Sequence, residues 1–357
     1  MRLHGRRERA TAAAVPILVI AALVAELGCR PLVPDASNRA AGSRSDAERQ
    51  EIRFDVGPVD LPAAGDDHGM PAMPGMENMA QPAPLRVSVP FDGWIHGFAV
   101  EVIDGRSHPL PRQLLHHVKV NVPAMRELFE PIMLRLIGAG AETGPQGLPS
   151  WLGFPVHRGE SLVLTAMLHN QTGESYSGVR VRVRIRYTAA GRWVPPVAAY
   201  PFFAHVTLPD SATDFDLPPG LTVRSREIRP ALDGRIFGLG GHLHRYAELL
   251  RFEDATTGRL IWETAPQTDA NQNIVSVPTK RFFVPFGAEL RRDHVYRLSV
   301  RYRNPTTQTI PWGGMATLGG IFLPNREEAW PVANASDPRY VADAKAEFVQ
   351  SGREQGH

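Results

Sequence analysis

The sequence predicts an all-β protein built from two tandem antiparallel β-sandwich domains. From residue 85 onward, short runs of β-branched and aromatic residues recur between Gly, Pro, Asn and Asp, a spacing typical of many-stranded sandwiches. One run, Val179–Tyr187, alternates apolar residues with arginine, which is the period of a strand with one buried and one solvated face. At 43% hydrophobic residues, the chain of 357 residues can fill such cores.

The first 29 residues have the pattern of an export signal. Four arginines precede an apolar stretch, Ala10–Ala25, which is shorter than the ~20 residues of a comfortable membrane span. Leu27-Gly28-Cys29 looks like the end of a bacterial lipoprotein box. We therefore expect residues 1–29 to be a signal peptide and Cys29 to be lipidated. The protein would then be exported to the periplasm and anchored to the outer membrane. A plain signal peptide with an incidental cysteine is the alternative.

Residues 30–85 are predicted to be a disordered, Met-rich linker. Small polar residues and proline dominate this segment, and it has too few large apolar residues to offset the entropy of ordering. Thioethers are soft ligands that can hold Cu(I). The possible auxiliary copper ligands are His68, Met70, Met73, Met76 and Met79. A tether whose methionines bind nothing is the other interpretation.

The strand pattern and the composition also predict the domain boundaries and exclude some partners and bonds. We expect an N-terminal sandwich over residues 86–208, a C-terminal sandwich over 209–332 and a polar tail over 333–357. Because the net charge is only +2 and the arginines are scattered, nucleic acid is not an expected partner. A single cysteine excludes a disulfide within the chain.

Five histidines and one methionine form two candidate metal sites. Imidazole suits copper, zinc, iron and nickel, and a thioether narrows the choice toward copper. On a strand, residues i and i+2 share a face, whereas adjacent residues face opposite sides unless the backbone turns. Taken by itself, the methionine could pack in the core and bind no metal, which is the alternative role for it. The first candidate set is His116, His117 and His169, and the second is His242, His244 and Met315.

The order of these residues resembles that of the copper type II, ascorbate-dependent monooxygenases, a family that includes peptidylglycine α-hydroxylating monooxygenase and dopamine β-monooxygenase. An adjacent His pair, a single His, a His-x-His and a Met follow one another, over residues 86–325. The resemblance implies two jelly-roll sandwiches, each with one copper ion. It assigns electron transfer to the first set, and dioxygen binding and catalysis to the second.

The activity that this resemblance implies is hydroxylation of a C–H bond in a small organic substrate. The reaction would use O₂, two copper ions, and ascorbate or another one-electron donor. The peptide-amidating members have Arg, Asn and Tyr where this chain has Gly240, Thr317 and Gly319, so a peptidylglycine substrate is not expected. The alternative function is a non-enzymatic, exported copper-binding lipoprotein for copper storage, delivery or sensing.

Overall fold

The computed structural model describes residues 50–63, 79–207, 214–270, 272–283, 286–325 and 330–348. All of them belong to one compact unit, Ser45–His357. Neither of the helical segments in these ranges is long and apolar enough to cross a membrane. The predicted signal peptide, its lipidation site and most of the Met-rich segment lie outside the described residues. The predicted site residues that fall there are Cys29, His68, Met70, Met73 and Met76.

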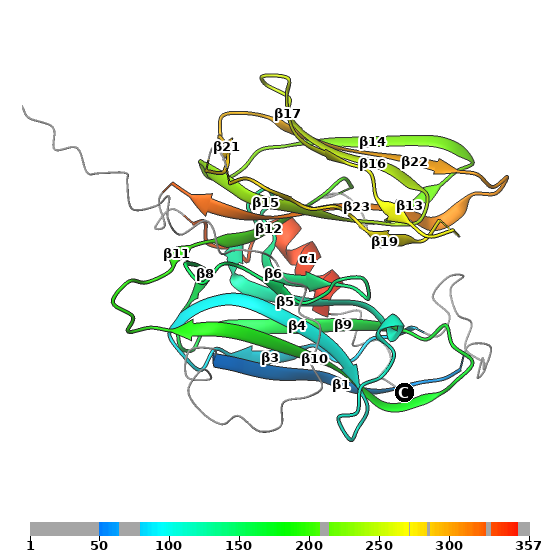
Figure 1. Cartoon of the computed structure of the whole chain (residues 1–357), viewed down its shortest axis with the longest axis horizontal. Coiled ribbons are helices and arrows are strands. Elements are labelled where there is room, and N and C mark those ends of the chain that lie inside the picture. The colour runs from blue at the N-terminus through cyan, green and yellow to red at the C-terminus, as the bar shows by residue number, and fades with distance from the viewer. Residues whose placement is uncertain are drawn as a thin grey trace, which may run out of the picture. The chain divides into compact units, whose positions relative to one another are not determined.

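Two mainly antiparallel sheets form the N-terminal sandwich (Figure 1). The first sheet has the order β1-β10-β4-β8-β11, with β7 paired to β4, and its β8–β11 pair is parallel. Its strands are β1 (Gln50–Leu61), β4 (Gly93–Ile103), β7 (Gln146–Gly147), β8 (Leu152–Val156), β10 (Tyr176–Ala189) and β11 (Val197–Ala198). The second sheet has the order β2-β9-β5-β6, with β3 paired to β9. Its strands are β2 (Met79–Ala80), β3 (Leu85–Ser88), β5 (Leu115–Arg126), β6 (Met133–Ala139) and β9 (Ser161–His169).

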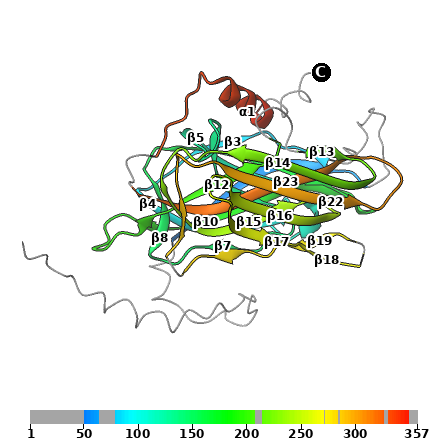
Figure 2. The same cartoon turned by 90° about the horizontal axis from the view of Figure 1, so that it is seen from above.

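Two further sheets form the C-terminal sandwich (Figure 2). The inner sheet, of order β12-β23-β15-β20, contains β12 (Tyr200–His205), β13 (Asp214–Leu217), β15 (Gly234–Leu243), β20 (Lys280–Arg281), β21 (Ala288–Leu290) and β23 (Ile310–Pro324). The outer sheet contains β14 (Gly220–Ile228), β16 (Ala247–Asp254), β17 (Arg259–Thr264) and β22 (Tyr296–Asn304). A two-stranded ribbon, β18 (Gln267–Thr268) and β19 (Ile274–Ser276), and a short 3-10 helix, Arg112–Leu114, lie outside these four sheets. The predicted all-β class with two antiparallel sandwiches is therefore confirmed.

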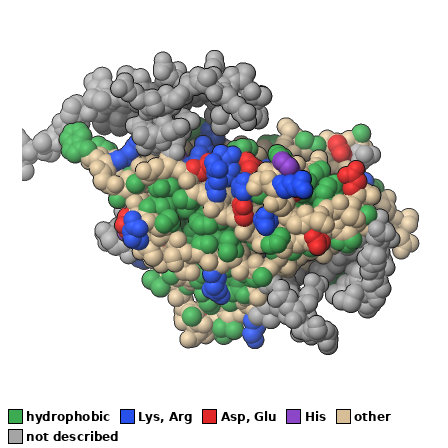
Figure 3. Space-filling view, turned by 90° about the horizontal axis from the view of Figure 1, so that it is seen from below, with side chains coloured by type: hydrophobic (Ala, Val, Ile, Leu, Met, Phe, Trp, Pro, Cys, Tyr) green, Lys and Arg blue, Asp and Glu red, His purple; other side chains and the backbone are tan. Residues whose placement is uncertain are grey.

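The arginine-rich strand is β10, in the middle of the first sheet. Its apolar residues are fully buried, as the period of two predicts. Its arginines pair with acids on neighbouring strands: Arg182 bonds Asp55 at 2.7 Å, and Arg184 bonds Glu51 at 3.0 Å. Figure 3 shows Lys and Arg side chains lying beside acidic ones on the face it displays. This strand is a solvated, ion-paired surface and not a stripe of one charge.

Two segments differ from their sequence-based description, and the tail contains a short helix, which its sequence allowed. Gln50–Leu61 lies in the predicted disordered linker, but it forms β1, which pairs with β10 and buries Val56 and Leu61. β12 lies in the predicted N-terminal range, but it pairs with β23 of the C-terminal sandwich. A helix, α1 (Pro338–Phe348), occupies the predicted polar tail. The limit between the two sandwiches stays a prediction.

The helix α1 is anchored by buried ion pairs. Glu347 lies 2.6 Å from Lys119 and 3.3 Å from Arg135, and it accepts a hydrogen bond from Thr165 at 3.3 Å. Arg135 also donates a hydrogen bond to Asp343, which lies one helical turn before Glu347. Burial alone would raise the pKa of Glu347, but the two cations outweigh it and lower this pKa to about 2. The tail is polar, as predicted, and its polar side chains attach it to β5 and β6.

We predict that Glu347→Gln lowers the free energy of unfolding by about 3 kcal/mol, because the partly buried Lys119 loses its carboxylate and the buried Arg135 loses one of its two. Since the pKa of Glu347 falls from 4.5 to about 2 on folding, the stability that it contributes is present above pH 4.5. That contribution is lost as the pH falls toward 2, and the variant should lack this dependence. Urea unfolding at several pH values measures both effects.

The matched control is Glu227→Gln, which removes the carboxylate from a surface pair with Arg297. Exposed pairs contribute less than about 1 kcal/mol, so this variant should unfold almost like the wild type. Equal losses in the two variants would contradict the importance of the buried network.

Candidate functional site

A β-bulge brings the adjacent histidines to one place. Leu115 pairs with Leu168 and His117 pairs with Met167, so His116 is an extra residue in β5 with no counterpart in β9. A bulge breaks the strict alternation of a strand and redirects a side chain. As a result, the rings of His116 and His117 lie 5.1 Å apart, centre to centre. The ring of His169, at the end of β9, lies 6.4 Å from that of His116. The structure therefore brings the first predicted set together.

His117 carries a buried nitrogen without a partner. Its Nδ1 atom is inaccessible to solvent and has no hydrogen-bond partner among the described residues. Burial lowers the pKa of His117 well below its usual value, and the nearby ammonium of Lys119 lowers it further. The imidazole is therefore neutral at pH 7 and keeps a lone pair available. A buried polar atom without a partner is rare and costs stability, so it requires an explanation.

A tyrosine hydroxyl holds the second set. Tyr302, on β22, is fully buried, and burial raises its pKa to about 12. Its hydroxyl oxygen accepts hydrogen bonds from the backbone N–H of His244 and from that of Met315, both at 3.1 Å. It also donates to the carbonyl of Met315. One side chain thus joins the ends of the two segments that carry the predicted ligands. The rings of His242 and His244 lie 5.5 Å apart, and Met315 is partly buried.

The two sets face each other. Burial lowers the pKa of His116, the charge of His169 lowers it next, and the charge of His242 on the other sandwich also contributes. Glu142, in the turn after β6, lies 3.1 Å from Nδ1 of His242 and joins the sandwiches directly. Burial would raise the pKa of Glu142, but its bond to His242 lowers it. The residues therefore form one histidine cluster between the sandwiches.

Sequence reasoning missed two polar residues beside this cluster. His205 on β12 and His242 on β15 both pair with Thr317 of β23, so the three side chains form a row on one face of the inner sheet. The Thr317 hydroxyl lies 2.9 Å from Nδ1 of His205, and burial lowers the pKa of His205 to about 3. Asp214 pairs with Met315, and its Oδ1 atom is buried without a hydrogen-bond partner among the described residues. Only pairing across strands reveals these neighbours, and no local motif marks them.

The predicted ligands lie near one another, but their side chains do not form a complete metal site. Within the described ranges, no group of three or more His, Cys, Asp or Glu side chains is close enough to hold a metal ion as it stands. The ready-made copper sites implied by the family resemblance are therefore not observed.

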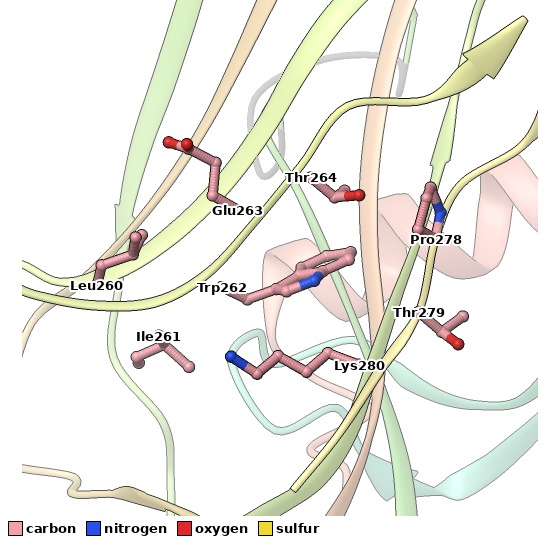
Figure 4. Close-up of a pocket in the computed structure, with 8 residues that line it drawn as sticks. All are labelled: Leu260, Ile261, Trp262, Glu263, Thr264, Pro278, Thr279 and Lys280. Carbon is pink, nitrogen blue, oxygen red and sulfur yellow. The ribbon is translucent and has the colours of Figure 1, made fainter.

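A surface hollow lies elsewhere on the C-terminal sandwich. It has a volume of about 510 Å³ and is lined by residues 260–264 and 278–280 (Figure 4). In this view Lys280 extends below the ring of Trp262, with its nitrogen toward Ile261. None of the predicted ligands lines this hollow, so it does not belong to the histidine cluster.

Comparison with known proteins gives only distant likenesses. No protein-family model matches the chain, and no curated protein does. Similar solved structures include PNGase F, a peptide:N-glycanase F, with 8% identity over 77% of this chain and 96% of that chain and a TM-score of 0.39. PNGF-II has 9% identity over 78% and 66%, with a TM-score of 0.37. A fucolectin from the serum of striped bass, Morone saxatilis, has 9% identity over 78% and 96%, with a TM-score of 0.15.

These findings overturn the predicted family. The similar structures are an N-glycanase, PNGF-II and a fucolectin, none of them is a copper monooxygenase, and no family model supports the resemblance. The predicted copper-dependent, ascorbate-using monooxygenase activity is wrong with it, because that activity came from the resemblance alone. The physical reason is that His-His, His-x-His and Gly-Met are short patterns, and their order along a chain does not constrain how they pack. The likeness to these structures is too distant to indicate an activity.

We predict that Tyr302→Phe destabilises the protein by about 1 to 3 kcal/mol, because buried backbone groups of His244 and Met315 lose their partner. Hydrogen exchange of these two amides should become faster. The control is Tyr296→Phe, which removes a buried hydroxyl bonded to the Arg291 N–H at 2.8 Å. It should cost similar stability and leave the exchange of His244 and Met315 unchanged, and faster exchange in both variants would contradict the role of Tyr302.

The pH dependence of the cluster can be tested separately. The pKa of His244 is lowered from 6.5 to about 4. Burial is the largest cause, and the charge of His242 is the second. The unfolded chain therefore binds a proton between pH 6.5 and 4 that the folded chain does not bind, so acid in this range destabilises the fold. NMR should show His244 titrating near pH 4, and His244→Asn should flatten the fall in stability. Titration of His244 near pH 6.5 would contradict its burial.

Proposed function

We propose that the histidine cluster binds transition-metal ions, with copper as the expected metal. His116, His117 and His169 would supply one ligand set, and the other would consist of His242, His244 and Met315. The proposal concerns binding alone, and no reaction is assigned to it. The observation that carries it is the buried, unpartnered Nδ1 atom of His117 in a ring that lies 5.1 Å from a second imidazole.

The ring separations support this proposal. With metal–nitrogen bonds near 2.0 Å, two imidazoles on one ion have ring centres about 4.5 to 6.5 Å apart, depending on the angle between the bonds. The separations in the cluster are 5.1, 6.4 and 5.5 Å. The ring centres therefore already stand at suitable distances, and rotation of the rings would bring their nitrogens to a common ion.

The protonation state supports it too. A metal ion binds neutral imidazole, so a protonated ring must first lose its proton. Burial lowers the pKa values of His116, His117 and His244, and the rings are therefore ready for binding at pH 7 without that cost. Export and lipid anchoring at Cys29 remain proposals about where this binding would take place.

The test is calorimetric titration of the full chain with Cu(II) and with Zn(II), followed by thermal unfolding. We expect His117→Ala to weaken binding to the first set at least about tenfold, since even the outer partners of ligands typically contribute 10 to 100-fold. Metal at 100 times its Kd should stabilise the wild type by about 2.7 kcal/mol. His116→Ala gives a second test, because His116 is more accessible to solvent than His117 and its removal should affect folding less.

The matched control is His157→Ala, which removes an exposed histidine outside the cluster. It should bind metal like the wild type. If the wild type binds neither ion, or if the control loses as much affinity as His117→Ala, the proposed function is wrong.

A further inference from the structure

The three-histidine half of the cluster has thioethers on both sides. Met167 of β9 is the direct partner of His117 on β5, and Met79 of β2 is the direct partner of His169 on β9. Residues directly opposite each other in an antiparallel pair have Cβ atoms about 4.5 to 5.5 Å apart and share a face of the sheet. Each methionine therefore lies beside a histidine of the set, on the histidine side of the sheet.

The alternation along the strands confirms which face this is. Leu168 is fully buried in the sandwich core, so Met167 and His169, its neighbours on β9, point to the opposite face. Ala80 pairs with Leu168, which leaves Met79 on the same face as His169. Met79 and Met167 are both partly buried, so neither is a freely solvated side chain.

We infer that a thioether from Met79 or Met167 completes the first metal set and gives it a preference for Cu(I). This inference rests on the proposed function and adds to it the oxidation state of the ion. Three imidazoles leave a fourth position open on a tetrahedral ion. A soft sulfur in that position favours Cu(I), whereas Zn(II) is bound well by imidazole nitrogens alone.

The location of Met79 explains why the sequence did not show this. In the sequence, Met79 belongs with the methionines at positions 70, 73 and 76 to a predicted auxiliary site in a linker. Met167 lies inside an apolar strand, where core packing is the expected role of a methionine. Only the register of β2, β5 and β9 places both sulfurs beside the histidines.

The test compares Cu(I) and Zn(II) affinities of the full chain and the double variant Met79→Leu with Met167→Leu, using competition with a chromophoric chelator for each ion. Leu and Met have similar volumes, so folding should be little affected. We expect the double variant to lose at least about tenfold in Cu(I) affinity and to keep its Zn(II) affinity within about twofold. Met133→Leu, a fully buried methionine of β6, is the matched control and should change neither.

X-ray absorption distinguishes the ligands directly. Because Met315 can also supply sulfur, the comparison is made in a Met315→Leu background. The Cu(I)-loaded background variant should show a copper–sulfur shell, and adding Met79→Leu and Met167→Leu should remove it. A chain that binds both ions while the double variant keeps its Cu(I) affinity would overturn this inference and leave the proposed function standing. A wild type that binds no metal would overturn both.

Discussion

The burial of polar groups on the outer face of the β5-β6-β9 sheet is the constraint on which the rest of the structure depends. Lys119 and Arg135 project from this face, and a buried cation is tolerated only when a carboxylate pairs with it. Helix α1 supplies the carboxylates of Asp343 and Glu347. The fully buried Glu127 accepts backbone N–H bonds from Arg135 and, across the sandwiches, from Phe203. The same face therefore attaches both the C-terminal helix and the second sandwich.

The histidine cluster occupies the part of this interface where polar groups are not all satisfied. Ion pairs satisfy Lys119 and Arg135, but Nδ1 of His117 and Oδ1 of Asp214 have no partner among the described residues. Both atoms belong to residues that lie in or directly beside the ligand sets. Asn121, Glu160 and Thr222 carry the other buried side-chain atoms without a partner among the described residues. At the ligand sets, a bound metal ion or another external group would complete the atoms of His117 and Asp214.

The sequence was sufficient for the fold class because strand alternation is a local signal, and the arginine-rich β10 shows it at its clearest. It could not show that Gln50–Leu61 is a strand, since this segment gains its stability from pairing with β10 and not from its own composition. It also identified the histidines correctly as neighbours, although the family inferred from their order was wrong. The bulge at His116, the hydroxyl of Tyr302 and the carboxylates of Glu142 and Asp214 all depend on pairing between distant segments. No pattern within one segment contains that information.

The charge balance of the interface bears on which ion it would favour. Neutral imidazoles and thioethers bring no negative charge, so the charge of an ion they bind must be compensated by other groups. Near the first set, Lys119 adds a positive charge that Glu347 already neutralises, and Glu142 is the carboxylate whose charge acts on His116. A monovalent ion bound at His116, His117 and His169 would therefore carry less uncompensated positive charge than a divalent ion would. Near the second set, Glu142 and Asp214 supply carboxylates. The two halves thus differ in charge as well as in ligand type, and the softer, less charged half is the one better suited to Cu(I).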